Sequence, residues 1–366
     1  MNKCSIYLRN EELDPSSFYR ISQYLQFLSK PYIIHSISTN KEFSRNLQIK
    51  NWFSKKIYQA FLYIRMSFRV LFFIFSDSVN KVETIIIQRT ILPRHMPFLI
   101  LLCLRYFYKD KNVIWDFDDN IIQSGEISRK EVNLLVEKSK KIIVTSNFLK
   151  ETLPKDALGK VILSPTTDLG LSLIYSNSLI KEREQTYDTS VNLIWIGTGG
   201  NIRFLNDIIE YLDDAANKLK SKYYKELNLY IICNIPLNTK THSLNICNIQ
   251  WTRDVAAEYL KKAHIGIMPL QDTYYTRGKA GFKLVQYMAT GLPVIGSNVG
   301  YNSSVVDENS GILISPNEES KWHDSIIKMS TNISFWNTMS LGARNKFLKD
   351  FNPQRNIELL NNCLNF

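Results

Sequence analysis

Twelve short runs of apolar, mostly β-branched residues recur along the chain, separated by segments with helical character. Runs that are apolar at nearly every position are typical of parallel strands, which are buried on both faces of a sheet. The pattern therefore predicts an α/β chain with two doubly wound domains of about six strands each. The predicted strands are 4–8, 32–37, 84–88, 113–117, 141–146 and 161–165, then 192–197, 229–233, 248–251, 265–270, 293–297 and 311–315.

A polar stretch separates the two sets of predicted strands. Residues 173–190 are rich in charge and show no apolar period, which is typical of a linker. We therefore expect an N-terminal Rossmann-like domain over 1–172, a linker over 173–190 and a C-terminal Rossmann-like domain over 191–366. The last helix could pack back on the first domain. Ligands of doubly wound sheets bind at the carboxyl ends of the strands, so tandem domains predict two parallel sheets facing a central cleft.

The charge balance predicts an anionic partner. The 366 residues include 45 Lys and Arg against 34 Asp and Glu, a net charge of +11. Nucleic acid, anionic lipid and phosphorylated metabolites all fit such a charge, as does an ordinary solvated surface. The five cysteines are scattered and form no CxxC pair, and the histidines form no HExxH motif. This argues against disulfides and a zinc site, and favours a reducing cytoplasm.

The most apolar stretch, residues 57–75, contains Arg65 and Arg69. A spanning helix needs ~20 apolar residues and a central arginine costs roughly 2.5–3.5 kcal/mol, so membrane crossing is disfavoured. Two interpretations stay open. The stretch is either a buried helix of the first domain whose arginines extend to solvent, or a helix in the membrane interface with its cations on lipid phosphates.

A strand, a glycine loop and an amphipathic helix follow one another at the start of the second predicted domain. Glycine lets a phosphate approach the backbone, and a helix N-terminus offers it unpaired N–H groups. A turn without chemical importance is the alternative. The next strand is followed by Asn234 and not by an acid, which argues against NAD. The loop residues predicted to bind a nucleotide donor are Gly197, Gly199, Gly200 and Asn201.

Cations lie beside glycines in the loop after the strand 265–270. The sequence "RGKAG" occupies 277–281 and precedes a short helical pattern that ends at Gly291. Arginine and lysine neutralise a diphosphate, while bare backbone N–H groups hold its oxygens. A solvated surface is the alternative. The residues predicted to bind the donor are Arg277, Lys279 and Lys283, then Gln286 for a sugar hydroxyl, and Gly300 and Asn302 in the following loop.

These motifs resemble those of a known enzyme family. The stretch "FKLVQYMATGLPVIGSNVGYN" resembles the donor-binding segment of glycosyltransferase family 4, whose members have the GT-B fold. "WIGTGGNIRFL", "IGIMPLQD" and "RGKAGFKL" occur in the order seen in a bacterial branch of that family, and "VIWDFDDNI" and "KIIVTSNFLKETL" resemble its first domain. The resemblance extends over about residues 80–350. It implies a nucleotide-diphosphate sugar on the second domain and an acceptor on the first.

The resemblance also implies a mechanism. Transfer in the family retains the anomeric configuration and needs no metal, because cations and a helix N-terminus stabilise the leaving diphosphate. The usual pattern has two glutamates eight residues apart, and here the first falls on Gly278 and the second on Gln286. Asp272 is the candidate replacement for the missing contact with the donor sugar.

Acidic residues follow the predicted strand 113–117. The motif "WDFDDN" contains Asp118 and Asp119 and is similar to the DxD metal motif of the other large glycosyltransferase fold. Here, however, the phosphate-binding features lie in the second domain. In the resemblance these acids face the donor, where a carboxylate orients the acceptor hydroxyl or stabilises positive charge on the anomeric carbon. A turn and helix cap is the alternative. The predicted catalytic residues are Asp118, Asp119, Arg277 and Lys279, with no metal or other cofactor.

The helix after the first strand begins with "PSSFYR". Its residues Ser17, Tyr19 and Arg20 are predicted to contact the acceptor, and plain helix capping is the alternative. The start of this helix follows a strand, and segments that follow parallel strands meet at one edge of the sheet, where ligands bind.

The chain is thus predicted to be a retaining hexosyltransferase. It would move a sugar from a nucleotide-diphosphate sugar to a saccharide or lipid-linked acceptor in the biosynthesis of surface polysaccharide such as O-antigen, lipopolysaccharide or capsule. One alternative is a sugar-nucleotide epimerase on the same fold, and another is a non-enzymatic protein that binds a membrane surface or nucleic acid. The predicted partners are the donor, the acceptor and an anionic membrane surface, but no nucleic acid. The predicted location is cytoplasmic or peripheral on the inner face of the plasma membrane.

Overall fold

The structure is a computed structural model that describes residues 3–365, and the chain divides into two compact units. The first unit contains the described residues up to Thr166 together with those from Gln354 onward, and the second is Thr167–Pro353. Each unit contains a six-stranded parallel sheet, in the orders β2-β1-β3-β4-β5-β6 and β12-β11-β10-β7-β8-β9. The predicted α/β architecture is confirmed.

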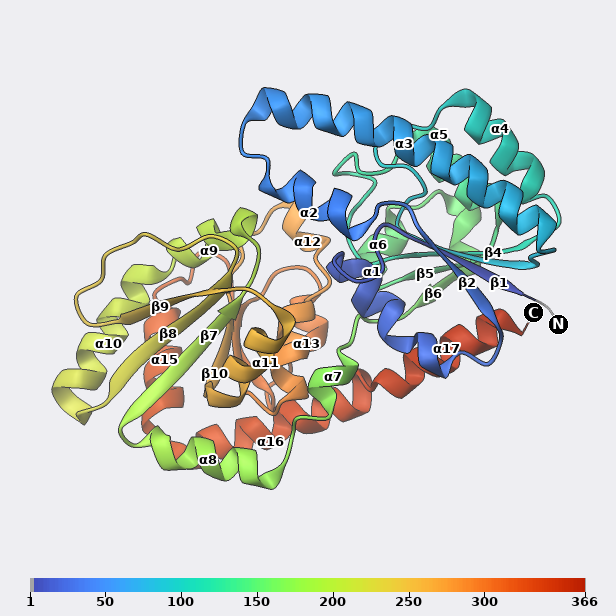
Figure 1. The fold of residues 1–366 in the computed structure, drawn as a ribbon. Helices are drawn as coiled ribbons and strands as arrows, with labels where there is room; N and C mark the ends of the chain where they lie inside the picture. The colour runs from blue at the N-terminus through green and yellow to red at the C-terminus, as the bar shows by residue number, and fades with distance from the viewer. Residues whose placement is uncertain (1–2, 366) are drawn as a thin grey trace. The chain divides into compact units, whose positions relative to one another are not determined.

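The sheet of the first unit alternates with helices (Figure 1). Its strands are β1 (Cys4–Leu8), β2 (Tyr32–Ser36), β3 (Thr84–Gln88), β4 (Asn112–Phe117), β5 (Ser139–Val144) and β6 (Val161–Leu163). Its helices are α1 (Pro15–Arg20), α2 (Asn40–Gln48), α3 (Trp52–Val79), α4 (Phe98–Phe107), α5 (Arg129–Lys138), α6 (Asn147–Glu151) and α17 (Pro353–Leu364), with short 3-10 helices at Ser22–Phe27 and Lys155–Lys160.

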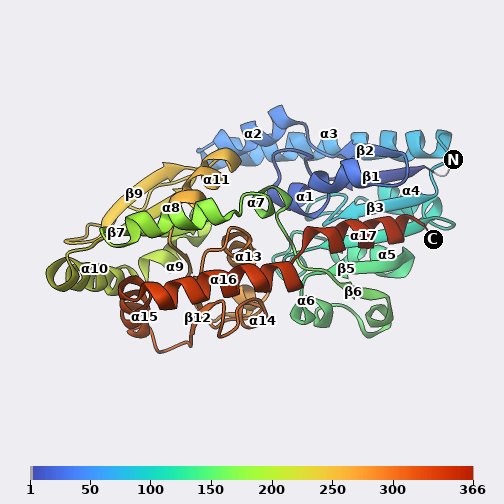
Figure 2. The ribbon, with the colours of Figure 1, turned by 90° about the horizontal axis from the view of Figure 1, so that it is seen from below.

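The strands of the first sheet send successive side chains to opposite faces, as a pleated strand must. Ile85 and Ile87 join the core beneath α3, α4 and α5, whereas Ile86 points to the other face. The last helix, α17, lies among the elements of this unit (Figure 2). Its Asn356 accepts a hydrogen bond from Ser164 and its Cys363 carbonyl accepts one from Asn112, so the C-terminal helix belongs to the first unit.

The second unit repeats this plan. Its strands are β7 (Ser190–Ile196), β8 (Glu226–Cys233), β9 (Asn245–Gln250), β10 (Ile265–Met268), β11 (Val294–Ser297) and β12 (Gly311–Ile314). Its helices are α7 (Leu169–Ser172), α8 (Asn177–Tyr187), α9 (Ile202–Asn206), α10 (Ile209–Tyr223), α11 (Arg253–Lys262), α12 (Tyr274–Arg277), α13 (Phe282–Ala289), α14 (Asn302–Val305), α15 (Lys321–Thr331) and α16 (Ile333–Asp350), with a 3-10 turn at Gly199–Asn201. Helices α10 and α15 cover one face, and α11, α13 and α16 the other.

The predicted linker is wrong. Residues 173–190 contain α8, which packs on the second unit and extends that unit back to Thr167, so the first domain ends before residue 172. The helix lacks an apolar period because an arginine occupies its central buried position. Arg183 is buried between Leu179 and Tyr187, and its guanidinium donates to the carbonyls of Lys261, Thr290 and Leu260 at 2.8–3.2 Å.

The long apolar stretch forms most of α3, which has two apolar faces. This helix is long and apolar enough to cross a membrane. One face, with Leu62, Met66, Val70 and Ile74, is buried in the core of the first unit. The opposite face is exposed.

The C-terminal end of α3 is fixed by a buried carboxylate. Asp77 is fully buried and accepts hydrogen bonds from Ser5 at 2.5 Å and Tyr7 at 2.7 Å, while the Nε2 atom of His35 lies 2.7 Å away. These partners come from β1 and β2, so the carboxylate ties α3 to the sheet across at least 42 residues of sequence.

We predict that Asp77→Ala lowers the free energy of unfolding by about 3 kcal/mol, because three buried polar side chains lose their shared partner. Urea denaturation monitored by tryptophan fluorescence measures the change. The exposed Asp156→Ala serves as the control and should shift the midpoint little. Equal effects of the two substitutions would show that Asp77 is not an anchor.

Candidate functional site

In the second unit, the loops after β7, β8, β10 and β11 meet at the carboxyl edge of the sheet, because neighbouring parallel strands point the same way. Most residues predicted to bind the donor lie in these loops. The structure therefore brings Gly197, the turn Gly199–Asn201, the loop 277–281 and the loop 298–302 to one edge.

Two of these loops touch through a glycine. Gly300 has a φ of 56°, and a Cβ atom placed on it would lie 2.4 Å from the carbonyl oxygen of Arg277. Only glycine tolerates both this dihedral and this approach. The contact clamps the loop after β11 against the end of α12 and sets the position of the cationic loop.

A second contact of this kind lies at the start of α13. Gly281 has a φ of 63°, and a Cβ atom there would meet Val305 at 2.9 Å and Oδ1 of Asn302 at 3.3 Å. Asn302 is buried and donates to the carbonyl of Ser297 at 3.0 Å, and its Oδ1 has no hydrogen-bond partner among the described residues. Glycine at the N-cap has no side chain to occupy the first N–H groups of α13, which suits an anion at that position.

The glycine loop after β7 adjoins the same helix. A Cβ atom on Gly197 would overlap the ring of Trp195 at 2.4 Å, and the Lys283 ammonium lies 5.7 Å from that ring's centroid. The backbone N–H of Gly199 donates to Asn234 at 2.8 Å. Asn234 stands where a dinucleotide site would have an acid, and its amide oxygen fixes the glycine loop. Asn201 donates to Thr198 at 3.0 Å and closes the turn.

The predicted cations have different surroundings. Arg277 is half-exposed and forms a two-pronged ion pair with Asp272, with N–O distances of 2.6 and 2.9 Å. The Arg277 side chain lowers the pKa of Asp272. The ammonium of Lys279 lies 4.9 Å from the centroid of the Tyr275 ring. In this geometry Asp272 is engaged in the ion pair with Arg277. The predicted contact of Asp272 with the donor sugar would therefore compete with that ion pair.

Gln286 is paired inside the protein. Its side chain is buried and its amide donates to the carboxylate of Asp168 at 2.9 Å. Its contact with a sugar hydroxyl stays a prediction. Burial raises the pKa of Asp168, which caps α7. A glutamine suits this position because a glutamate would place two carboxylates together. Sequence reasoning missed Asp168, since nothing in the chain marks it as the partner of residue 286.

In the first unit, the carboxyl ends of β1, β3 and β4 bring together a cluster of charges. Asp118 and Asp119 lie after β4, as predicted, and both bind Arg89, which directly follows β3. The distances from its guanidinium are 3.0 Å to Asp118, 2.6 Å to Asp119 and 3.3 Å to Glu126. Ser16 of α1 also donates to Asp118.

The charges in this cluster are balanced around Arg89. Burial raises the pKa of Asp118, but the Arg89 and Arg20 charges outweigh it and the net shift is downward, so the carboxylate is ionised. The Asp118 side chain is 13% exposed and that of Asp119 47%, which makes Asp119 the more accessible acid.

Arg89 is a second residue that sequence reasoning missed. Its φ is 62°, an uncommon conformation for a side chain of this size, and its backbone N–H donates to the carbonyl of Asp116 at 2.7 Å. Strained residues of this kind cluster at functional sites. The available signal was its position. Arg89 immediately follows the buried strand TIIIQ, at the edge of the sheet where ligands bind.

The three residues predicted to contact an acceptor lie behind this cluster. Ser17 is fully buried and donates to Asp14 and Gln88, and Tyr19 is buried as well. Arg20 binds Asp116 and the carbonyl of Ser164. In this structure they brace the strands and do not present atoms to solvent. Their contact with an acceptor stays a prediction.

The part of the chain that the structure describes contains no group of three or more His, Cys, Asp and Glu side chains placed to hold a metal ion. The Asp118, Asp119 and Glu126 carboxylates surround a guanidinium instead.

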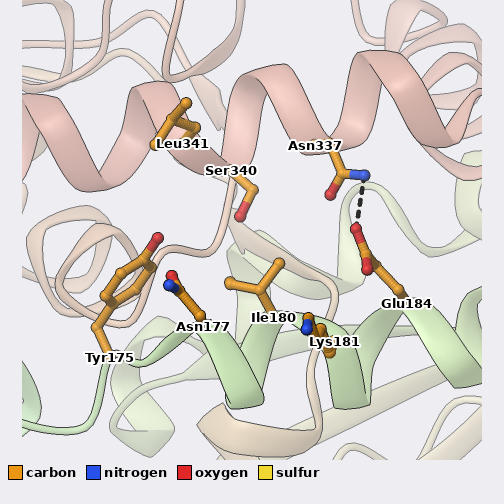
Figure 3. A pocket seen from close by; sticks show the side chains of 8 residues that line it. All are labelled: Tyr175, Asn177, Ile180, Lys181, Glu184, Asn337, Ser340 and Leu341. Carbon is orange, nitrogen blue, oxygen red and sulfur yellow. Dashed lines mark hydrogen bonds between the residues drawn. The ribbon is translucent and has the colours of Figure 1, made fainter.

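A separate pocket of about 360 Å³ lies between α8 and α16 of the second unit (Figure 3). Within it Glu184 accepts a hydrogen bond from Asn337 at 2.7 Å. The pocket contains Tyr175, whose ring contacts Gly291 just before β11. It therefore adjoins the amino edge of the sheet, opposite the glycine loops.

The comparisons with known proteins address the second unit directly. Residues 192–332 match the family model described as glycosyl transferases group 1. This stretch is similar to glycosyltransferase group 1 domains. It contains all the predicted donor-binding residues, and the chain is accordingly an enzyme of the glycosyltransferase class. No curated protein matches the chain in sequence.

Solved structures share the fold at low sequence identity. HepE of Anabaena, in complex with UDP and glucose, is 11% identical with a TM-score of 0.64, covering 100% of both chains. A glycosyltransferase of Rickettsia africae is 13% identical with a TM-score of 0.63, covering 99% of this chain and 97% of the other. Sucrose-phosphate synthase of Thermosynechococcus elongatus is 12% identical with a TM-score of 0.59, covering 98% and 97%. The fold is therefore GT-B, as predicted.

We predict that Gly300→Ala weakens binding of a nucleoside diphosphate at least tenfold, because the new methyl group forces the loop off Arg277. Isothermal titration measures the affinity. Gly159→Ala, where a Cβ atom meets nothing within 4 Å, is the matched control and should bind as the unchanged protein does. Unaltered affinity in Gly300→Ala would refute the role of the clamp.

We predict that Gln286→Glu is destabilised in a pH-dependent way. Two adjacent carboxylates raise the pKa of the buried pair above the unfolded values near 4, so the penalty is absent at low pH and grows as pH rises. A shift of about two pKa units corresponds to about 3 kcal/mol at pH 8. Urea denaturation at pH 4.5 and pH 8 tests this against the exposed Gln123→Glu. A loss independent of pH would contradict the pairing with Asp168.

Proposed function

We propose that the chain transfers a sugar from a nucleotide-diphosphate sugar to a saccharide or lipid-linked acceptor, with retention of configuration, in the biosynthesis of surface polysaccharide. The observation that carries the proposal is the cationic glycine loop 277–281, clamped by Gly300 and Gly281 at the N-terminus of α13. The fold and the group 1 domain support it, as do the solved complexes of HepE with UDP and with UDP-glucose.

The donor diphosphate is proposed to lie on the second unit. Lys279 and Lys283 neutralise it, and N–H groups at the start of α13 and in the turn Gly199–Asn201 bind its oxygens. When the bond between the anomeric carbon and the phosphate oxygen breaks, negative charge grows on the diphosphate. Groups that are already in place stabilise this charge most, because they need no reorganisation during the reaction. This chemistry needs no metal, so we propose a metal-independent reaction.

The acceptor is proposed to bind the first unit. The exposed Asp119 carboxylate orients the acceptor hydroxyl, and the buried Asp118 and Arg89 fix its position. Asp119 is thus the proposed catalytic carboxylate of this unit, whereas Arg89 is a positioning residue.

We predict that Lys279→Ala lowers the rate of nucleotide release about 100-fold or more, because a charge that stabilises the leaving diphosphate is lost. The assay measures nucleoside diphosphate released from a nucleotide sugar in the presence of a chelator. Lys240→Ala, an exposed lysine of the same unit, is the control.

The fold of Lys279→Ala should be intact, since this side chain is only partly buried. Circular dichroism checks this. Full turnover in the substituted protein, alongside full turnover in the control, would exclude the loop from donor binding.

A further inference from the structure

The exposed side of α3 and α4 forms a continuous apolar surface. On α3 the exposed residues recur every third or fourth position, which places them along one face of the helix. Helix α4 packs beside α3 and extends this surface (Figure 1). We call the surface the α3–α4 face: Phe53, Ile57, Phe61, Ile64, Phe68, Phe72, Phe75 and Val79 on α3, and Phe98, Leu99, Leu102 and Tyr106 on α4, each between 46% and 85% exposed.

Exposure on this scale is unusual in a protein without a partner. Most monomeric proteins limit contiguous apolar patches to a few hundred square ångströms, and larger ones mark interaction sites. The spacing from Phe53 to Val79 corresponds to about 39 Å along the helix at 1.5 Å per residue. Five of the side chains on this face of α3 are phenylalanine, so the face is neither small nor polar.

The helix cannot leave the protein to cross a bilayer. Its inner face packs into the core of the first unit, and Asp77 ties its end to β1 and β2. Arg65 and Arg69 both pair with Glu42 of α2 at 3.3 and 3.0 Å. The sequence left two interpretations of this stretch open, a buried helix and a helix in the membrane interface. The inner side of α3 fits the first, and its exposed outer side is compatible with the second.

The charges around the face favour an anionic partner over a second copy of the chain. Helices α3 and α4 together carry Lys55, Lys56, Arg65, Arg69 and Arg105 but a single carboxylate, the buried Asp77. Glu42 pairs with Arg65 and Arg69, and Glu137 pairs with Arg105, so the net positive charge of these helices comes mainly from Lys55 and Lys56. Two copies meeting through this face would bring like charges together. An anionic surface would instead attract them.

A lysine-lined pocket continues the positive charge beyond the end of α4. It has a volume of about 620 Å³ and lies at the amino ends of β4 and β5, next to the exposed Tyr106. Its lining residues are Lys109, Asp110, Lys111, Asn112, Lys140 and Lys141. Phosphate groups of lipids fit such a rim, while acyl chains fit the phenylalanine surface.

We propose that the α3–α4 face docks the protein on an anionic lipid bilayer, with α3 lying in the plane of the interface. The N-terminal end of α3 follows α2 from the carboxyl edge of the first sheet, where Arg89 and Asp119 lie. Docking therefore brings the membrane surface to the edge of the unit proposed to bind the acceptor. That last step rests on the proposed function, whereas the docking itself does not.

The experiment is flotation of the full chain with phosphatidylcholine vesicles, with and without phosphatidylglycerol. We expect binding to the vesicles that contain phosphatidylglycerol, weakened by added salt because of screening. The double substitution Phe68→Glu with Phe72→Glu should reduce bound protein at least tenfold. The matched control, Leu173→Glu with Leu348→Glu, changes two exposed apolar residues of the other unit and should bind like the unchanged protein.

A substitution of the charges separates the two parts of the proposal. Lys109→Glu with Lys111→Glu should weaken binding to vesicles that contain phosphatidylglycerol severalfold while the apolar face is unchanged. Thermal shift with UDP, measured without vesicles, should be the same in all variants, so loss of docking is distinguishable from loss of donor binding.

Four results would overturn the proposal. The first is an unchanged protein that stays in solution with both kinds of vesicle. The second is a phenylalanine double variant that floats as well as the unchanged protein. The third is equal binding of the unchanged protein to neutral and anionic vesicles. The fourth is a lipid-free dimer, seen by light scattering, that the same substitutions convert to monomer, because a second copy would then cover the face.

Discussion

The parallel course of the strands is the constraint on which the sites depend. Because all strands within each sheet point the same way, every loop that follows a strand lies at one edge. Residues as distant in sequence as Gly197 and Gly300 then share an edge of the second unit, and Ser16 and Asp118 share one in the first. Close backbone contacts refine this arrangement, and at Gly300 and Gly281 they require glycine.

The charged side chains of the two sites have different surroundings. In the second unit, cations lie on a partly exposed loop and contact aromatic rings or one exposed carboxylate, which leaves them suited to a mobile anionic ligand. In the first unit, Arg89 is buried among three carboxylates and cannot change partners without a large cost. The first arrangement suits binding and release, and the second suits a fixed orientation of Asp119.

The apolar runs predicted all twelve strands of the described chain. The central strands are buried on both faces and need apolar residues at nearly every position, whereas the edge strands β2, β6 and β9 are only partly buried. Prediction failed where a polar residue is buried. Arg183 hid α8 by occupying an apolar position, and the pairing of Gln286 with Asp168 was not foreseen. Arg89 was missed because the carboxylates that pair with its guanidinium are 29 or more residues away in sequence. Such pairings depend on tertiary contacts that spacing alone does not reveal.

Binding of a nucleoside diphosphate at the cationic glycine loop of the second unit is the step on which the proposed function depends. A thermal-shift series with UDP, GDP, dTDP, CMP and NAD, without added metal, tests it most directly, since a ligand that binds only the native state raises the melting temperature. We expect a shift with one class of nucleoside diphosphate, no shift with NAD, and loss of the shift in Lys279→Ala. A protein that melts cooperatively but shows no shift with any diphosphate would contradict it.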